Sequence, residues 1–320
     1  MSWTDADFTA AFAEVDNAGR WGEDDELGTL NHITPETVVR AARLVETGLV
    51  LSLAHPLTSE PTEQNIELRA FYAAAAGPSG APPFAGDRLT IEVHQQSVTH
   101  LDCISHIGSH LGLAYNKRPM ADVASANGVR HGSINAQRGG IVTRGVFLDV
   151  AAALGVRWLE PTHEITPEDL EAAETYSQVR VQKGDALVLR SGSEARGQSE
   201  GWSPLMAGPS VAAARWMQAR EIAVYTGDAP DHISDLGARI LGRQTNGPSQ
   251  GREAPSSERF PLPFHQIAIP AMGLVLLDHA AVEELASVCC NLGRYEFLFV
   301  ASPLPIQNGS GSPVNPLAIF

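Results

Sequence analysis

The chain has few basic residues for its acidic content, and this shortage limits the partners it can bind. It contains 22 Lys and Arg residues against 37 Asp and Glu residues, which gives a formal net charge of −15. A strongly acidic chain is repelled by phosphate backbones and by anionic membrane surfaces. We therefore expect neither nucleic acid nor a membrane as a partner. A small-molecule substrate of any charge stays open, because the local field of a cleft can oppose the net charge.

Cysteines and long apolar runs are also scarce. The chain has 3 cysteines, two of them adjacent at Cys289 and Cys290, which is not the pattern of a disulfide framework. We expect Cys103 to be a buried thiol. No apolar run reaches the length of a membrane span, and the first residues are acidic, unlike the basic start of a secretory signal. We therefore expect a cytoplasmic protein.

The sequence also lacks internal repeats and any long low-complexity linker. It is therefore predicted to form a single domain over residues 1–320, with an N-terminal helical extension over residues 1–48. Residues 59–87 contain several Gly and Pro residues around a short apolar run. This long excursion is predicted to be a lid over the site, with a solvent-exposed variable loop as the alternative.

Helix and strand patterns follow one another without strict alternation, which favours a mixed α/β (α+β) domain over a doubly wound sheet. Thr34 and Thr166 each precede a proline and are typical helix caps. The main helices are predicted at residues 5–15, 35–47, 167–176, 209–220 and 280–286. The main strands are predicted at residues 49–53, 89–102, 141–150, 186–189, 222–225, 264–269, 273–277 and 295–301.

Polar and ionisable side chains are densest between Gln95 and His106. The preceding residues alternate apolar and polar, as in a half-buried strand, and a continuing strand would place Gln96, His100 and Asp102 on one face. His100 and Asp102 would then lie roughly 7 Å apart along the strand and could share one metal ion. Imidazole and carboxylate groups both suit zinc or manganese. A surface strand that binds no ion is the alternative.

The segment Thr99-His100-x-Asp102-x-x-x-His106 resembles the core of the H-x-G-T-H-x-D-x-P-x-H signature of the cyclase family, which includes bacterial kynurenine formamidases and isatin hydrolase. The likeness runs from about Trp21 to the C-terminus and includes residues 21–31, 115–116, 144–150, 264–273 and 309–316. It implies a cyclase-like β/β/α fold with a strand barrel or layered sheets and outer helices. It also implies a homodimer or a homotetramer.

The resemblance further implies which residues hold the metal. His100 and Asp102 match ligands of the family, whereas the first His of the signature is replaced by Gln96, whose amide oxygen is a weak neutral ligand. His94 precedes that position by two residues. His265 and Asp278 match residues that complete a second metal position in the family, so one or two Zn or Mn ions are expected. The expected substrate pocket includes four further residues: Trp21, Tyr115, Asp228 and Ser312.

The chemistry expected of such a site is hydrolysis. The metal would activate water, and His106 would act as the general base, with activity rising with pH through about 6 to 7 as for an ordinary imidazole. The expected substrate is a small cyclic or aromatic amide, imide or lactone. A G-x-S-x-G nucleophile elbow does not occur in the sequence. Two alternatives stay open: a lyase or cyclase that uses the same base, and a ligand-binding homologue that has lost its metal through Gln96.

Overall fold

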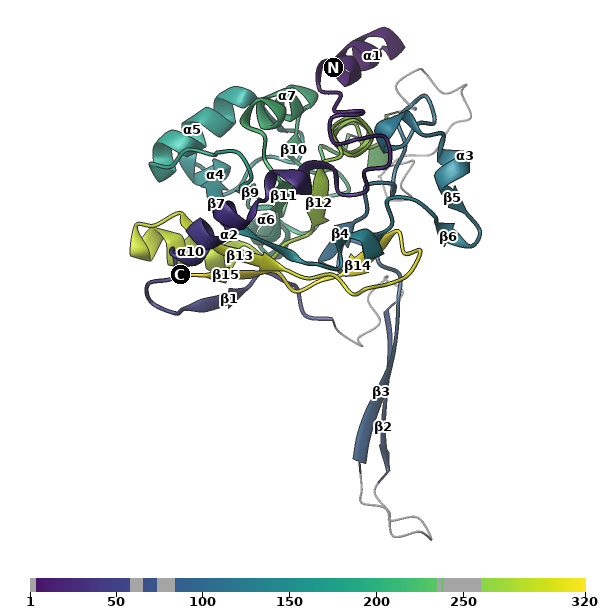
Figure 1. Cartoon of the computed structure of the whole chain (residues 1–320). Helices are drawn as coiled ribbons and strands as arrows, with labels where there is room; N and C mark the ends of the chain where they lie inside the picture. Colours follow the sequence, from purple (N-terminus) through teal and green to yellow (C-terminus); the bar gives the residue numbers. More distant parts are fainter. Residues whose placement is uncertain (1–3, 58–65, 74–83, 235–236, 239–259) are drawn as a thin grey trace.

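The largest element of the molecule is a nine-stranded sheet (Figure 1). The computed structural model describes residues 4–57, 66–73, 84–234, 237–238 and 260–320. The strand order is β1-β15-β13-β7-β9-β11-β12-β4-β14. These strands span β1 Val50–Ser52, β4 His100–Asp102, β7 Ile141–Asp149, β9 Ala186–Arg190, β11 Val224–Gly227, β12 Val275–Asp278, β13 Glu296–Ala301, β14 Gly311–Pro313 and β15 Leu317–Ile319.

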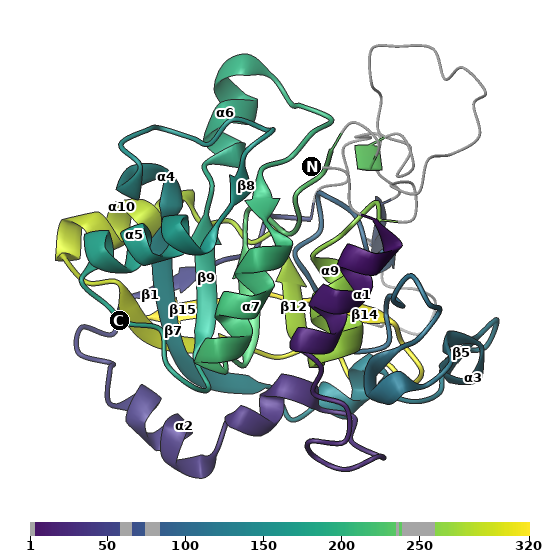
Figure 2. The same cartoon turned by 90° about the horizontal axis from the view of Figure 1, so that it is seen from above.

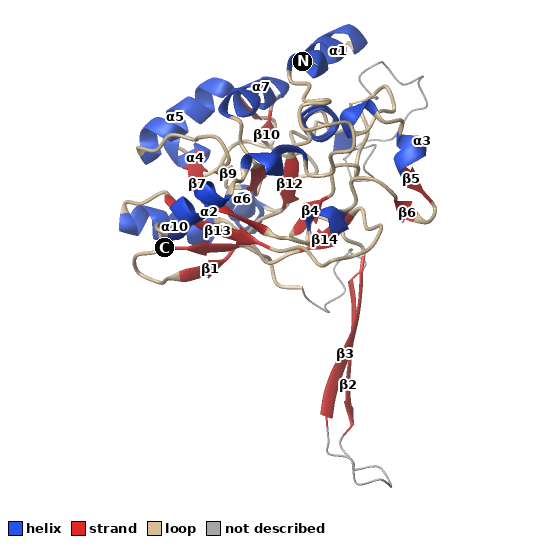
Figure 3. Cartoon of the chain, in the orientation of Figure 1, coloured by secondary structure: helices blue, strands red, loops and turns tan. Residues whose placement is uncertain are grey.

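The sheet has a parallel centre and antiparallel margins. Strands β7, β9, β11 and β12 run parallel, whereas the pairs β1–β15, β15–β13, β13–β7, β12–β4 and β4–β14 are antiparallel. The sheet is strongly twisted and curled, with the longer helices outside it (Figure 3). A mixed sheet with outer helices confirms the predicted mixed α/β class.

The parallel centre is buried on both faces. Leu187 and Leu189 of β9 belong to one hydrophobic cluster, and Ala186 and Val188 belong to the other. This follows from the alternation of side chains along a strand covered on both faces. The helices α5 and α7 cover the first face (Figure 2). The helices span α1 Asp5–Glu14, α2 Pro35–Ala42, α3 Met120–Val123, α4 Val150–Ala153, α5 Pro167–Ser177, α6 Ser193–Glu200, α7 Val211–Arg220, α9 His265–Ile267 and α10 Glu283–Leu292.

Shorter elements decorate this frame. Two small two-stranded sheets pair β5 (Ala124–Ser125) with β6 (Gly128–Val129) and β8 (Glu164–Ile165) with β10 (Gly208–Pro209). Single-turn 3-10 helices lie at Gly28–His32, Tyr115–Lys117 and Ile134–Gln137, and a π-helical turn spans Ala268–Met272. In the described part of the chain, every helix is too short or too polar to cross a lipid bilayer.

A β-hairpin stands apart from the rest of the molecule. Strands β2 (Ile66–Ala73) and β3 (Phe84–Ile91) pair antiparallel along their whole length and project away from the body (Figure 1). Strand β2 and the first residues of β3 belong to the segment 59–87, which was predicted to be a lid or a variable loop, and its role as a lid stays a prediction. Residues 59–65 and 74–83 of that segment lie outside the described residues.

Helix starts agree with the capping residues of the sequence. Helix α5 begins after Thr166, whose hydroxyl accepts a hydrogen bond from the backbone N–H of Asp169 (3.2 Å). The Asp169 carboxylate in turn accepts the Thr166 backbone N–H (2.9 Å), which completes a capping box. Helix α2 has the same arrangement after Thr34 but ends at Ala42, before the expected stop at Gly48. The sequence therefore predicted where these helices begin, and α2 is shorter than expected.

Two predicted strands are wrong. The strand expected to run through residues 89–102 is broken: β3 ends at Ile91, residues 92–99 form turns, and β4 starts only at His100. Residues 264–269 are helical instead of extended. The carboxylate of Asp231 accepts the backbone N–H groups of Phe264 (3.2 Å) and His265 (2.9 Å) and so caps the start of this helix from a distant part of the chain.

Candidate metal centre

The site forms where β4 pairs with β12. The antiparallel register places Asp278 opposite His100 and Leu277 opposite Leu101. Because side chains alternate along a strand, His100 and Asp102 point to one face while Leu101 points into the opposite core. The strand pairing thus gathers three ionisable groups that are separate in sequence.

These three groups form the first cluster. His100, Asp102 and Asp278 are all buried, and one ligand atom from each lies within 4.8 Å of the others. Both carboxylate oxygens of Asp102 and Oδ1 of Asp278 are buried without a hydrogen-bond partner. A buried carboxylate with unsatisfied oxygens is costly, unless a cation compensates it. Imidazole nitrogen and carboxylate oxygen fit a divalent ion such as zinc or manganese, so the residues present suit a metal.

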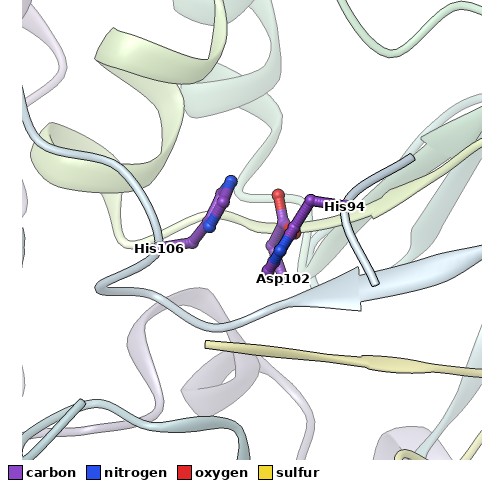
Figure 4. Close-up of side chains that lie close together, drawn as sticks. All are labelled: His94, Asp102 and His106. Carbon is purple, nitrogen blue, oxygen red and sulfur yellow. The ribbon is translucent and has the colours of Figure 1, made fainter. Parts of the chain in front are cut away.

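A second cluster shares Asp102. His94 Nε2 lies 3.3 Å from Asp102 Oδ1, and His106 completes a set whose ligand atoms also lie within 4.8 Å of one another. Figure 4 shows the two imidazoles facing each other beside the carboxylate. Their ring centroids are 3.8 Å apart, and the planes differ by only 7°. His94 reaches this place because the chain turns after β3, where a continuous strand was expected.

Gly311 makes room for the His94 ring. A Cβ atom at Gly311 would lie 2.6 Å from His94 Nε2, closer than real Cβ contacts allow. Gly311 belongs to β14, which pairs with β4 opposite Asp102. The missing side chain at this position therefore lets His94 approach the carboxylate from the edge of the sheet.

Hydrogen bonds fix the orientation of two further imidazoles. His100 Nδ1 lies 2.7 Å from the carbonyl oxygen of Val98, so this nitrogen carries the proton and Nε2 is left as the electron-pair donor, 3.6 Å from Asp102 Oδ1. His265 Nδ1 lies 2.9 Å from Asp231, and its Nε2 lies 3.0 Å from Asp278. Partners of this kind orient metal-binding histidines.

The electrostatics of the site favour charged carboxylates. Burial alone would raise the pKa of Asp102, but the three neighbouring imidazoles outweigh burial and hold that pKa well below its ordinary value. Burial likewise opposes ionisation of Asp278, yet His265 lowers its pKa. Burial would lower the pKa of His265, but Asp278 and Asp231 raise it well above the ordinary value. The carboxylates of Asp102 and Asp278 thus stay ionised although both are buried.

The two facing imidazoles differ in their acidity. Burial lowers the pKa of His106 to about 4, although Asp102 opposes this shift. For His94, burial would also lower the pKa, but the Asp102 carboxylate, whose Oδ1 lies 3.3 Å from His94 Nε2, raises it overall. His106 is therefore neutral near pH 7 and can accept a proton.

A cavity of about 370 Å³ opens onto both clusters. Pro230, Ile233 and Leu262 supply an apolar wall. His279 also lines it and has a left-handed backbone with φ of 56°. The cavity is thus part apolar wall and part ionisable cluster, as in many small-molecule sites.

The structure separates the predicted site residues into two groups. It brings His100, Asp102, His106, His265 and Asp278 together around this cavity. Gln96 also lines the cavity. Sequence reasoning did not assign His94 and Asp231 to the site, because their roles depend on a turn and on a contact across the chain. The only local signal for His94 was its place beside the motif.

The four residues expected in the pocket do not line the described part of this cavity. Asp228 accepts backbone N–H groups of Ser191 (2.6 Å) and Gly192 (2.9 Å), so it holds the turn after β9. The hydroxyl of Tyr115 donates to Asp25 (3.1 Å). Trp21 packs edge-on against a buried imidazole. Ser312 is fully buried in β14, where it pairs with Leu101 of β4.

Comparison with known proteins agrees with this architecture. The sequence matches the Cyclase family model over residues 51–232, which is more than half of its 320 residues. The chain therefore belongs to the cyclase family, as the sequence motifs predicted. No curated protein sequence matches it significantly.

Solved structures share the fold. A crystal structure described as a novel cyclase is 29% identical, with a TM-score of 0.78 over 97% of this chain and 99% of that chain. Isatin hydrolase A from Labrenzia aggregata, bound to benzyl benzoate, is 20% identical, with a TM-score of 0.55 over 87% of this chain and 94% of that chain. An isatin hydrolase bound to the product analogue thioisatinate is 14% identical, with a TM-score of 0.54 over 90% and 99%. The chain thus has a fold that hydrolases also use.

Proposed function

We propose that this protein is a metal-dependent hydrolase of a small cyclic or aromatic amide, imide or lactone. The observation that carries the proposal is the set of buried carboxylate oxygens on Asp102 and Asp278 that have no hydrogen-bond partner. A divalent cation compensates such oxygens at a site lined by imidazoles. The fold shared with isatin hydrolases supports the hydrolytic reading.

His100, Asp102 and Asp278 would hold one Zn or Mn ion, and His94 with Asp102 would contribute to a second. When bound, such an ion polarises a carbonyl group and lowers the pKa of water. The alternative of a homologue that lost its metal depended on Gln96. The nearness of His94 to Asp102 supports metal binding without a ligand at position 96.

His106 is the proposed general base. Its imidazole is partly buried and neutral near pH 7, and it lies beside Asp102, where a reacting water would be bound. The stacked ring of His94 limits rotation of His106. A neutral, oriented imidazole can take a proton from water and return it to the leaving group. Both the hydrolase and the lyase alternative would use this group.

The lining of the cavity supports a substrate with an apolar ring. Pro230, Ile233 and Leu262 line the same space as the ionisable side chains. A substrate with a ring against this wall would direct its carbonyl group toward the carboxylates. Isatin, arylformamides, cyclic imides and lactones are therefore the substrates to test first, since one structural neighbour is an isatin hydrolase bound to a product analogue.

Elemental analysis and a substrate panel test the proposal. Protein from medium supplemented with Zn or Mn should carry at least about one ion per chain, and Asp122→Asn, which changes an exposed carboxylate, should keep it. At least one compound of the panel should be hydrolysed only by the metal-loaded protein. Less than roughly 0.1 ion per chain in a correctly folded sample would refute the metal-dependent mechanism.

We also propose that the chain forms a homodimer, with the β2–β3 hairpin as the contact. An isolated two-stranded hairpin is marginally stable in water and needs further packing. The hairpin projects from the body, and Asp87, Arg88 and Leu89 of β3 are exposed. Light scattering after size-exclusion chromatography should give twice the chain mass. Arg88→Glu with Leu89→Glu should give a monomer, whereas a monomeric wild-type chain would contradict the proposal.

A further inference from the structure

A second, smaller cavity adjoins the main one. Its volume is about 50 Å³, and its walls include Leu159, Trp202, Leu205 and Met206. Gln96 lines both cavities, so its side chain stands at their boundary. The small cavity is therefore next to the space where the proposed substrate binds.

The backbone ties the two cavities together at a second point. Met206 lines the small cavity and Ile233 lines the main one. The Met206 N–H donates to the Ile233 carbonyl (3.2 Å), and the Ile233 N–H donates to the Met206 carbonyl (2.9 Å). This bridge and Gln96 lie where the two cavities adjoin. We call the small cavity the side compartment.

The compartment has a mainly apolar character. Its one cationic side chain, Arg196, donates to the carbonyl oxygen of Gly201 (3.1 Å) and lies 3.5 Å from the Glu200 carboxylate. The charge of Arg196 is therefore already engaged. Trp202, which is 74% exposed, lies over Gly197, where a Cβ atom would be 2.7 Å from the indole ring. A large aromatic side chain kept at the rim of an apolar space is suited to cover an apolar ligand.

We propose that this side compartment binds a small apolar substituent of the substrate whose carbonyl group reacts at the metal centre. The inference rests on the proposed function, because it uses the same substrate and the same cavity. A cavity of 150 Å³ can bind benzene, so about 50 Å³ suits a methyl or an ethyl group but not a second ring. Gln96, which lines both cavities, then acts at their junction as a specificity residue.

Binding of alkylbenzoates to the zinc-loaded protein tests the compartment without relying on turnover. Benzoate and its 3- and 4-methyl, ethyl and butyl derivatives are titrated by calorimetry. Each methylene up to ethyl should tighten binding about fourfold, which corresponds to about 0.8 kcal/mol per buried methylene. Butyl should bind less tightly than ethyl because it exceeds the space. Equal affinity of benzoate and both ethylbenzoates would overturn the proposal.

Variants locate the effect. Trp202→Ala should abolish most of the gain from the ethyl group, and Leu205→Trp should make ethylbenzoate bind more weakly than benzoate. Leu111→Ala, which removes another exposed apolar side chain that lines neither cavity, should leave the series unchanged. A gain that survives in Trp202→Ala and Leu205→Trp would place the substituent elsewhere and contradict the compartment.

Turnover separates this inference from the proposed function. Arylformamides with the same ring substituents are assayed for hydrolysis in parallel. If neither these arylformamides nor any isatin, cyclic imide or lactone of the panel is hydrolysed while the benzoates show the expected gradient, the hydrolase proposal fails and the compartment stands. If hydrolysis occurs with no preference for methyl or ethyl substituents and no binding gradient, the compartment is refuted and the hydrolase proposal stands.

Discussion

The candidate metal centre has two halves that are built differently. His100, Asp102 and Asp278 lie on paired strands, whose register fixes their positions through backbone hydrogen bonds. His94 and His106 lie on the irregular segments that flank β4. All three strand residues are buried, whereas the His94 side chain is 26% exposed. We call His100, Asp102 and Asp278 the strand half of the site, and His94 and His106 the loop half. The strand half is therefore rigid, whereas sequence changes can rearrange the loop half.

This difference accounts for the departure at Gln96. On a regular strand, a residue two positions before a ligand cannot take over its role, because the strand register holds its side chain at a fixed distance along the strand. In the turn over residues 92–99, the chain brings His94 to Asp102 instead. Asp231 adds a fixed contact to His265 from another part of the chain. A motif can thus lose one signature residue and keep its cluster of ligand atoms.

Asp102→Asn should have the largest effect, because this residue belongs to both clusters. The amide removes the charge that attracts a cation and that keeps the imidazoles in place. We expect bound Zn or Mn to fall below about 0.1 ion per chain and activity to fall by more than about 10⁴-fold. Elemental analysis and kcat/KM measure the two losses. A variant that keeps its metal would show that Asp278 and the imidazoles suffice, and the two halves would then be independent.

His106→Ala should lose turnover and keep most of the metal. Removing a general base costs about 10²–10⁴-fold in rate, whereas the strand half still holds an ion. Because burial lowers the pKa of His106 to about 4, its active neutral form persists down to that pH. Activity that depends on His106 should therefore fall only as pH drops through about 4, and a bound cation would lower this pKa further.

The lowered pKa of His106 also changes the pH profile that the sequence alone predicts. An ordinary imidazole would give an acid limb at about pH 6 to 7, which ignores the burial of His106. The wild-type profile of kcat/KM should lack that limb. A limb at pH 6 to 7 that disappears in His106→Ala would mean that the site is more hydrated than its burial indicates. Loss of metal together with activity would make His106 a ligand.

Gly311→Ala should disturb the loop half alone. The added methyl group would meet the His94 ring at 2.6 Å, so His94 must move while every ionisable group is retained. The Gly311 backbone does not have a positive φ, so alanine causes no backbone strain there. We expect metal affinity to fall by roughly 10-fold or more, as when a partner of a ligand is lost, and to a similar degree in His94→Gln.

Chelator competition measures these affinities. His163→Gln, which changes a histidine that is paired with Asp169 away from the site, is the matched control and should bind metal normally. Unchanged affinity in both Gly311→Ala and His94→Gln would mean that the strand half binds metal alone. His94 would then serve only to orient the general base His106, on which it stacks.

The sequence predicted the strand half and His106 but missed His94, for physical reasons. The spacing of His100 and Asp102 fixes a shared face once they lie on a strand, and the capping residues fix where α2 and α5 begin. The turn over residues 92–99 has no such rule, because alternation in β3 suggested that the strand continued. The helix at His265 depends on the distant Asp231 carboxylate, and tertiary contacts of this kind override local strand propensity.

Gln96→His should have the smallest effect on metal binding, although it restores the signature of the family. Gln96 lines the same cavity as the ionisable clusters, and His94 already lies beside Asp102. A new imidazole at position 96 would have to displace His94 to reach the ion, and the exchange of one neutral imidazole for another brings little net free energy. We expect the metal affinity to change by less than about threefold in chelator competition, which is smaller than the roughly 10-fold loss expected when a hydrogen-bond partner of a ligand is removed. A much tighter site would show that the turn can be rebuilt around position 96, whereas a large change in substrate preference at constant metal affinity would agree with the place of Gln96 between the two cavities.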